Sequence, residues 1–310
     1  MKHPAKDFIV LDTVTDYTRL CGLSAPAHPL LALIDFADTR HQPRPAAGSV
    51  VQQLYTIWLK KGLKGRLPYG HQSYDFSEGV LGFQAPGQVF TIDASLDISE
   101  LSGWMVVFHP DLLARYPLGG KMANYGFFSY AVHEALHLSA GEETTLNRLI
   151  DGIRAEYERP IDAFSQDVLV SQLEVLLNYA NRFYHRQFLT RRSAENDRDG
   201  GSLLTRFETQ LTAYFAQKAE QPLPTVQFFA DELHVSPAYL SDMLRSLTGQ
   251  STQQHIHQAL IEKAKRLLLT TSLSINETAF QLGFEYPQYF SRLFKKRTGL
   301  TPAEFRSSVP

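Results

Sequence analysis

The sequence predicts an α+β protein, in which a β-rich amino-terminal half precedes an all-helical carboxy-terminal domain. Between residues 20 and 110, short β-prone runs alternate with turns that contain glycine or proline, as in an antiparallel sandwich or barrel. From about residue 124 the apolar residues recur with helical spacing. Around 190–202 the apolar content falls to one alanine, which indicates a linker. We therefore expect a β-rich domain over 1–123, a helical segment over 124–189, a linker over 190–202 and an all-helical domain over 203–310.

Composition excludes several classes of protein. The chain has 310 residues, of which 44% are hydrophobic and 20% charged, so sizeable cores can form and global disorder is excluded. Its single cysteine, Cys21, cannot form an intrachain disulfide, which excludes a disulfide-stapled secreted scaffold. Neither a signal-like apolar stretch at the start nor a run of about 20 apolar residues is present. We expect a cytoplasmic protein with no membrane partner.

Three runs predict strands in the β-rich half: Tyr55–Leu59, Val89–Ile92 and Trp104–His109. Ala85-Pro86-Gly87 is a turn signal between such runs.

A long helix is predicted near the end of the helical segment. Its apolar residues advance by 4, 3, 4 and 3, the spacing of a coiled-coil seam. The seam could join two copies of the chain, or the helix could lie on its own barrel, and two heptads are too few to decide. The residues are Leu169, Leu173, Leu176, Ala180 and Phe183.

Residues 225–249 predict a first helix-turn-helix unit. A helix over about 225–233 is followed by a short turn. Ser236 then caps a second helix, with Pro237 at its first position, where the missing N–H is not needed. Ala230 is expected at the contact between the two helices. The expected core residues are Leu233, Val235, Leu240 and Leu244.

Residues 274–299 repeat the pattern. Ala279 is the small residue expected at the helix contact, and Gly283 is the residue expected to need a positive φ at the turn. Phe290 and Phe294 should face the core. The outward residues of the second helix carry groups that read base edges or neutralise phosphates: Gln288, Ser291, Arg292, Lys295 and Lys296.

A helix over about 253–270 is predicted between the two units. At 1.5 Å per residue it is roughly 27 Å long, against about 34 Å between successive major grooves on one face of DNA. This end of the chain is also locally basic, since residues 241–310 carry 9 Lys and Arg against 5 Asp and Glu. Two units with such a spacer favour a DNA-binding domain that spans two adjacent major grooves.

Residues 203–306 resemble the DNA-binding domain of the AraC family of transcription regulators. The residues that carry the resemblance are Gly283-Phe284, Phe290, Phe294-Lys295, Gly299, Thr301-Pro302 and Phe305-Arg306. The amino-terminal part is similar to the family's cupin-like sensing domain with following helices. Its supporting runs are His28-Pro29-Leu30, Tyr74-Asp75-Phe76, Ala85-Pro86-Gly87-Gln88 and Asn181-Arg182-Phe183-Tyr184.

The resemblance implies a transcription regulator that binds double-stranded DNA, forms a homodimer, contacts RNA polymerase and responds to a small-molecule effector. It implies no cofactor and no metal, and it leaves activation and repression open. An effector would act by shifting the relative placement of the DNA-binding halves. The predicted DNA-contacting residues are Ser236, Ala238, Tyr239, Ser241, Asp242 and Arg245 in the first unit, and Tyr286, Gln288, Tyr289, Ser291, Arg292, Lys295 and Lys296 in the second.

Two residues of the first unit depart from the family pattern. Asp242 stands where many relatives carry a basic or amide residue, and a carboxylate repels phosphate and could accept only from a cytosine amine. His234 fills a turn position often held by glycine, which costs strain if its φ is positive. We therefore expect the first unit to bind DNA less tightly than the second.

Parts of the sequence are also compatible with two other classes of function. His133-Glu134-x-x-His137 matches a zinc-peptidase motif, with Glu156 at a spacing seen for a third ligand. The match lies in a segment expected to be helical, without a substrate-binding strand pattern beside it, so we expect helix-surface or packing histidines and no enzyme. The second alternative is an interaction protein whose helix-turn-helix units contact only other proteins.

An effector pocket would lie in the β-rich half, because small barrels enclose aromatic side chains with a few polar groups. For each candidate, packing in the core is the more common role and ligand contact the less common one. His28, His71 and His109 lack the close spacing of a metal site. The pocket candidates are Tyr55, Trp58, His71, Tyr74, Phe83 and Trp104.

Overall fold

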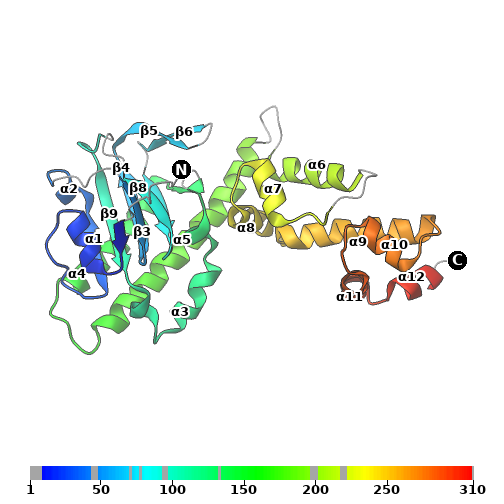
Figure 1. The fold of residues 1–310 in the computed structure, drawn as a ribbon. Helices are drawn as coiled ribbons and strands as arrows, with labels where there is room; N and C mark the ends of the chain where they lie inside the picture. Colours follow the sequence, from blue (N-terminus) through cyan, green and yellow to red (C-terminus); the bar gives the residue numbers. More distant parts are fainter. Residues whose placement is uncertain are drawn as a thin grey trace, which may run out of the picture. The chain divides into compact units, whose positions relative to one another are not determined.

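The computed structural model describes residues 9–42, 48–69, 72–76, 79–92, 97–131, 134–195, 202–216 and 222–308. The chain divides into two compact units, Met1–Gln187 and Phe188–Pro310. The first unit combines strands with helices, and the described residues of the second contain helices and no strand (Figure 1). This confirms the predicted α+β class.

The first unit contains two main sheets and a hairpin. The larger sheet is antiparallel, with strand order β10-β7-β4-β9-β2, and the smaller has the order β1-β3-β8. The predicted runs form β4, β8 and β9, and the turn at Ala85–Gly87 joins β7 to β8. The strands are β1 (Ile9–Leu11), β2 (Leu31–Asp35), β3 (Gly48–Gln52), β4 (Tyr55–Lys61), β5 (Leu63–Tyr69), β6 (Gln72–Phe76), β7 (Val80–Gln84), β8 (Val89–Ile92), β9 (Ser102–Phe108) and β10 (Leu136–His137).

The two main sheets share one apolar core. Alternate side chains of a strand point to opposite faces of its sheet. Trp58 of β4 and Met105, its neighbour on β9, lie on the inner face, where they join Val50 of β3 and Tyr17 of α1 (Val14–Leu20) in one buried cluster. The arrangement is therefore a sandwich of sheets, closed on one side by α1.

Helices cover the opposite face of the five-stranded sheet (Figure 1). The Trp104 indole N–H donates to Asn147 Oδ1 of α4 (Ala140–Tyr157) at 2.9 Å. The Phe83 ring lies 6.2 Å from the Tyr184 ring of α5 (Ser165–Glu195). The remaining helices of this unit are short: α2 (Phe36–Thr39), α3 (Pro117–Lys121), η1 (Pro110–Leu113), η2 (Met122–Asn124) and η3 (Gly126–Ser129).

The predicted seam of the long helix faces its own unit. Its five residues are buried in the single chain, with exposed fractions from 0% to 7%. They cannot also form a contact between two copies, so the assignment of these residues to a dimer helix is wrong and the packing alternative is right. The residues are Leu169, Leu173, Leu176, Ala180 and Phe183.

Two boundaries differ from expectation. The segment expected to be helical from 124 begins with 3-10 turns and then contributes β10, which pairs with β7. Helix α5 continues to Glu195, through the first part of the predicted linker, and residues 196–201 lie outside the described ranges. Helix formation continues because residues 190–195 include no glycine or proline, the two residue types that most strongly disfavour a helix.

The second unit contains two helix-turn-helix pairs. The first pair is α7 and α8, where Ser236 accepts from the Tyr239 N–H and Pro237 opens α8. The second pair is α10 and α11, where Ser274 and Glu277 form a capping box on α10. The helices are α6 (Leu203–Ala216), α7 (Val226–Leu233), α8 (Pro237–Thr248), α9 (Thr252–Thr270), α10 (Ile275–Gln281), α11 (Pro287–Thr298) and α12 (Pro302–Ser308).

The turns between the paired helices both need a left-handed residue. Gly283 takes this conformation in the second unit with a φ of +88°, as predicted. His234 takes it in the first unit with a φ of +59° and a ψ of 42°. A residue with a β-carbon is strained there by about 1–2 kcal/mol, so the predicted cost at His234 is real.

We expect His234→Gly to raise the free energy of unfolding by about 1 kcal/mol, because glycine removes this strain. Urea unfolding of the full chain, followed by circular dichroism, measures the change. Gly249→Ala is the reciprocal control, since Gly249 has a φ of +77° and open space around an added Cβ. It should lower stability by a similar amount, and a neutral or destabilising His234→Gly would contradict the strain.

Candidate nucleic-acid interface

Two aromatic residues set the orientation of α11. Phe290 and Phe294 are fully buried, with ring centroids 5.7 Å apart, and Phe294 also packs against Phe305 of α12. With this face fixed, helical periodicity points other side chains outward. The exposed predicted residues are Tyr286, Gln288, Tyr289, Arg292, Lys295 and Lys296, while Ser291 is half-buried.

The exposed face of α11 is strongly basic. The helix carries Arg292, Lys295, Lys296 and Arg297 and no acidic residue. None of the four pairs with a carboxylate among the residues that the structure describes. The Arg292 guanidinium lies 5.4 Å from the centroid of the Tyr289 ring, a cation–π contact that limits its rotamers. Uncompensated cations at an exposed helix favour a polyanionic partner.

Helix α8 has a different electrostatic character. Arg245 Nη1 lies 2.9 Å from Asp242 Oδ1 one helical turn earlier, so the only cation of the helix is neutralised within it. The Ser241 hydroxyl donates to Thr252 Oγ1 at 3.1 Å. Because Asp242 stands where many relatives carry a basic or amide residue, α8 has a net charge of zero.

Three predicted contacts of the first unit lie at the start of α8. Ser236 and Ala238 are half-buried, and the Ser236 hydroxyl already accepts a backbone N–H as the cap. Tyr239 is only 3% exposed. Its ring is part of the core, so the prediction that Tyr239 contacts DNA is wrong.

Helix α9 separates the two units. Its 19 residues correspond to about 28 Å at 1.5 Å per residue, close to the predicted spacer. His257 of α9 meets α11, where its Nδ1 lies 3.2 Å from Arg297 Nη2. Arg297 was not among the residues predicted to contact DNA, although it directly follows Lys295 and Lys296 in one basic run.

The environment of His257 lowers the pKa of its imidazole below 6.5. Burial is the largest cause, followed by the positive charges of Arg297 and Lys296. Burial also lowers the pKa of His255, two residues earlier on α9. The negative charge of Glu208 partly opposes this shift. A neutral His257 can accept from Arg297, which holds that guanidinium at the end of α11.

The zinc-peptidase motif lacks its structural context. His133 lies outside the described residues, and His137 lies on β10, where the one-turn spacing of a helix does not apply. Glu134 is 1% exposed and accepts from the Ala131 N–H at 2.6 Å. Glu156, the candidate third ligand, pairs with Arg159. The expectation that the motif lies on a helix is wrong. Within the described ranges, no group of three potential metal ligands lies together.

The predicted effector residues do not converge on one pocket. Trp58 faces the space between the sheets, whereas Tyr55, Phe83 and Trp104 face the helices. Trp58, Phe83 and Trp104 are buried and Tyr55 is half-buried. His71 lies outside the described residues, as does the side chain of Tyr74. A single pocket lined by all the described candidates is excluded by the alternation of β4 side chains.

Comparison with known proteins matches the second unit to a family. The family described as "Helix-turn-helix domain" matches residues 229–308. Over 138 residues the chain is 30% identical to the uncharacterized transcriptional regulatory protein YesN of Bacillus subtilis (strain 168), covering 43% of this chain and 36% of that protein. Over 140 residues it is 31% identical to the HTH-type transcriptional activator RhaR of Escherichia coli (strain K12), covering 45% of each. The matches span less than half of each relative.

Among solved structures, the C-terminal domain of AraT, a response regulator from Geobacillus stearothermophilus, is 34% identical, covers 34% of this chain and 84% of that one, and has a TM-score of 0.31. Together with the family match, the sequence relatives define the class of the second unit. Residues 229–308 form a helix-turn-helix domain. No helix within the described ranges is both long and apolar enough to cross a bilayer.

The neutral state of His257 predicts a pH dependence of stability. Because its folded pKa is lowered, the unfolded chain gains a proton as pH falls through 6.5 while the folded chain does not. The stabilisation is therefore complete above pH 6.5 and is lost as pH falls further. Urea unfolding at pH 7 and pH 5 should show a drop that is smaller in His257→Gln than in the wild type. An equal drop in both proteins would contradict the assignment.

Proposed function

We propose that the protein is a sequence-specific DNA-binding transcription regulator of the AraC type, with α11 as its main reading helix. The observation that carries the proposal is the set of four cations on α11 that lack a carboxylate partner within the described structure. They lie on the second helix of a helix-turn-helix pair, which is the helix that enters the major groove in such pairs. The relatives named as transcription regulators support the same function.

Each residue type on α11 suits a different part of DNA. Arg292, held over the Tyr289 ring, can present its guanidinium edge to the O6 and N7 acceptors of guanine. Gln288 can pair with adenine by its amide. Lys295 and Lys296 are suited to phosphate, which fixes the register without reading sequence.

The first unit has a weaker role in this proposal. The Asp242 carboxylate neutralises Arg245 and repels phosphate, so α8 contributes little of the nonspecific attraction. Asp242 can accept from a cytosine amine, and Ala238 offers an apolar contact to a thymine methyl. Helix α8 would thus add sequence preference in the adjacent major groove, while α11 supplies most of the affinity.

A small-molecule effector in the first unit is part of the proposal. Of the predicted pocket residues, Trp58 faces the space between the sheets. The Lys60 ammonium lies 4.6 Å from the centroid of the Trp58 ring and 5.4 Å from that of Phe36. Burial lowers the pKa of Lys60 to about 8, partly offset by Cys21. An anionic effector at Lys60 would relieve this cost and favour one arrangement of the chain over another.

We also propose a homodimer through a stripe of α5 that differs from the predicted seam. Val168 and Val175 of α5 are 37% and 41% exposed, and Phe164, directly before the helix, is 70% exposed. Their spacing of 4 and 7 residues places them on one face. Ile161 is 56% exposed just before the helix. A second copy of the same stripe would cover these side chains by a two-fold contact. Two DNA-binding domains would then act together, next to RNA polymerase for activation or in its way for repression.

A zinc hydrolase is not part of the proposal. Its motif would need two histidines one helical turn apart, and His137 lies on a strand. A protein that uses its helix-turn-helix units only for protein contacts is the other alternative, and the DNA-binding measurement below distinguishes it.

The α11 variants should separate base contacts from phosphate contacts. We expect Arg292→Ala to weaken binding to the DNA upstream of the protein's own gene by about 1–3 kcal/mol, with a smaller loss on a scrambled duplex. Lys296→Ala should weaken binding to both duplexes and reduce the salt slope by about 1. Asp242→Asn should strengthen binding, because it frees Arg245. Fluorescence anisotropy across a salt series measures all three.

Lys121→Ala is the matched control, because Lys121 is an exposed lysine of the first unit that pairs with Glu174. It should leave both affinities unchanged. Unchanged affinity in both Arg292→Ala and Lys296→Ala would remove α11 from the interface. A wild type without preference for the upstream duplex at any salt, with each of a panel of small-molecule effectors, would support the protein-contact alternative.

The stripe on α5 predicts the oligomeric state. The wild type should sediment as a dimer, and the Val168→Glu, Val175→Glu double variant as a monomer, because buried carboxylates would face each other across the contact. Asn181→Glu adds the same charge to an exposed position on another face of α5 and should leave the dimer intact. A dimeric double variant, or a monomeric wild type, would refute this surface.

A further inference from the structure

The ammonium of Lys60 lies among apolar groups and has no counter-charge in the part of the chain that the structure describes. Lys60 follows Trp58 by two residues on β4, so both side chains lie on the inner face of the five-stranded sheet. Lys60 Nζ lies 4.6 Å from the centroid of the Trp58 ring and 5.4 Å from that of Phe36. No described residue forms a hydrogen bond or an ion pair with this ammonium. Cation–π contacts offset only part of the free energy that an ammonium loses when it leaves water.

The neighbours of Lys60 across the sheet offer it no polar side chain. Val80 of β7 lies opposite Lys60 and is buried, and Gly103 of β9, on the other side, has no side chain. Phe36, the first residue of α2, is buried in the same apolar cluster as Trp58. Lys60 itself is half-buried, so part of its side chain is accessible to a small molecule.

The thiol of Cys21 does not neutralise the ammonium. Cys21 caps the end of α1, and its charge would act on Lys60 if the thiol ionised. Burial raises the pKa of the Cys21 thiol to about 11, so the thiol stays protonated at neutral pH. A protonated thiol is a poor nucleophile. Cys21 therefore does not compete with Lys60 for an electrophilic ligand.

The amine of Lys60 is suited to act as a nucleophile. Burial lowers the pKa of Lys60 to about 8, so more of the amine is unprotonated at neutral pH than in a solvated lysine, whose pKa is about 10.4. Lysines desolvated among apolar groups are the ones that form imines with carbonyl compounds in proteins. A neutral imine would remove the cost of the buried charge, and a carboxylate next to a protonated imine would offset it.

We propose that Lys60 binds a small 2-oxo acid covalently, as an imine. The amine nitrogen attacks the ketone carbon, and the two amine hydrogens leave with the ketone oxygen as one molecule of water, so a C=N bond replaces the C=O bond. The step needs no oxidant or reductant, and hydrolysis reverses it. The carboxylate of the acid then lies beside the imine nitrogen and compensates its charge. This inference rests on the effector site proposed above at Lys60 and names the chemistry of the effector.

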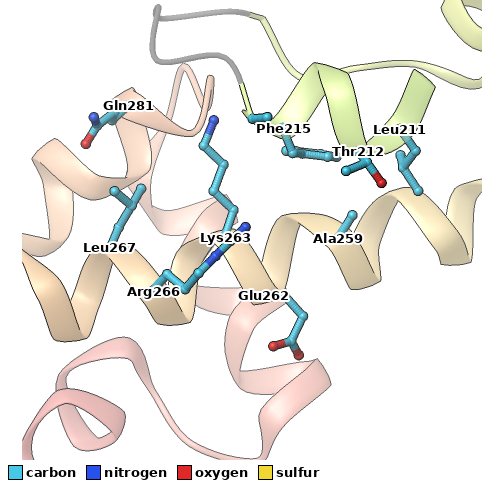
Figure 2. A pocket seen from close by; sticks show the side chains of 10 residues that line it. Leu211, Thr212, Phe215, Ala259, Glu262, Lys263, Arg266, Leu267 and Gln281 are labelled. Atoms are coloured by element: carbon cyan, nitrogen blue, oxygen red, sulfur yellow. The ribbon is translucent and has the colours of Figure 1, made fainter. Parts of the chain in front are cut away.

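Lys263 of the second unit provides an internal comparison. Its Nζ lies 5.9 Å from the centroid of the Phe215 ring, beside a cavity of about 570 Å³ (Figure 2). Burial and the positive charge of Arg266 lower the pKa of Lys263 as well. Unlike Lys60, however, Lys263 has a further interaction with a neighbouring group. A lowered pKa alone would make both lysines reactive, whereas the proposal expects reaction at Lys60.

Reductive trapping of the full chain with pyruvate tests the proposal. Sodium cyanoborohydride converts an imine to a stable secondary amine, and peptide mass spectrometry then locates the adduct. We expect Lys60 to be the main labelled lysine, with about tenfold less adduct at Lys61 and at Lys263. Lys61 is the matched control, because it points to the other face of β4 and its Nζ lies 2.7 Å from Glu143 Oε1. Lys60→Arg keeps the positive charge and should abolish the main adduct, whereas Lys61→Arg should leave it unchanged.

Pyruvamide, which has the same ketone without the negative charge, tests the preference for an acid. Each probe is scored by the ratio of adduct at Lys60 to adduct at Lys61, which cancels the different reactivity of the two ketones. We expect a ratio about tenfold higher with pyruvate, because only its carboxylate compensates the buried charge. Equal ratios for the two probes, or no more pyruvate adduct at Lys60 than at Lys61, would overturn the proposal.

The mapping uses the wild-type protein, so it stands even if Lys60→Arg does not fold. It is also independent of DNA. Absence of the Lys60 adduct in a protein that binds its upstream duplex would overturn the imine and leave the regulator intact. A Lys60 adduct in a protein without any DNA binding would support the imine and count against the regulator.

Discussion

The second unit is organised by one apolar stripe along α9. Ile256, Leu260, Ile261, Ala264 and Leu268 are at most 2% exposed, and the helix packs against α6, α8, α10 and α12. The two helix-turn-helix pairs are therefore attached to the same rigid element, since burial of these side chains is the main favourable term that holds them. The placement of α8 and of α10 relative to one another depends on this stripe.

Sequence patterns predicted the second unit closely because its signals are local. A serine cap, a proline at the first position and a residue with positive φ each act through the backbone within a few residues. Ser236, Pro237, Gly283, Phe290 and Phe294 consequently occupy their predicted places. The same reasoning identified the strain at His234 and the unusual Asp242, although it did not predict the ion pair that Asp242 forms with Arg245.

The first unit was predicted less well because its contacts join distant parts of the chain. Periodicity identified the apolar face of α5 but not the surface that it covers, so Leu169 and its neighbours were open to two interpretations. Aromatic composition grouped Tyr55 with Trp58, whereas strand alternation places them on opposite faces. Helical spacing around His137 was overridden by pairing with β7. Such tertiary effects decide short segments whose local preference is weak.

The length of helix α9 also sets the angle by which one helix-turn-helix pair is rotated relative to the other about the helix axis. Each residue of an α-helix adds about 1.5 Å of length and about 100° of rotation, so the two pairs are held at one distance and one angle. DNA is itself a screw with a repeat of about 10–10.5 base pairs. For a protein that reads DNA through both pairs, a single residue inserted in α9 would turn one pair away from the duplex. The spacing of two half-sites in such an operator is therefore a property of the protein, set by a helix that touches no base.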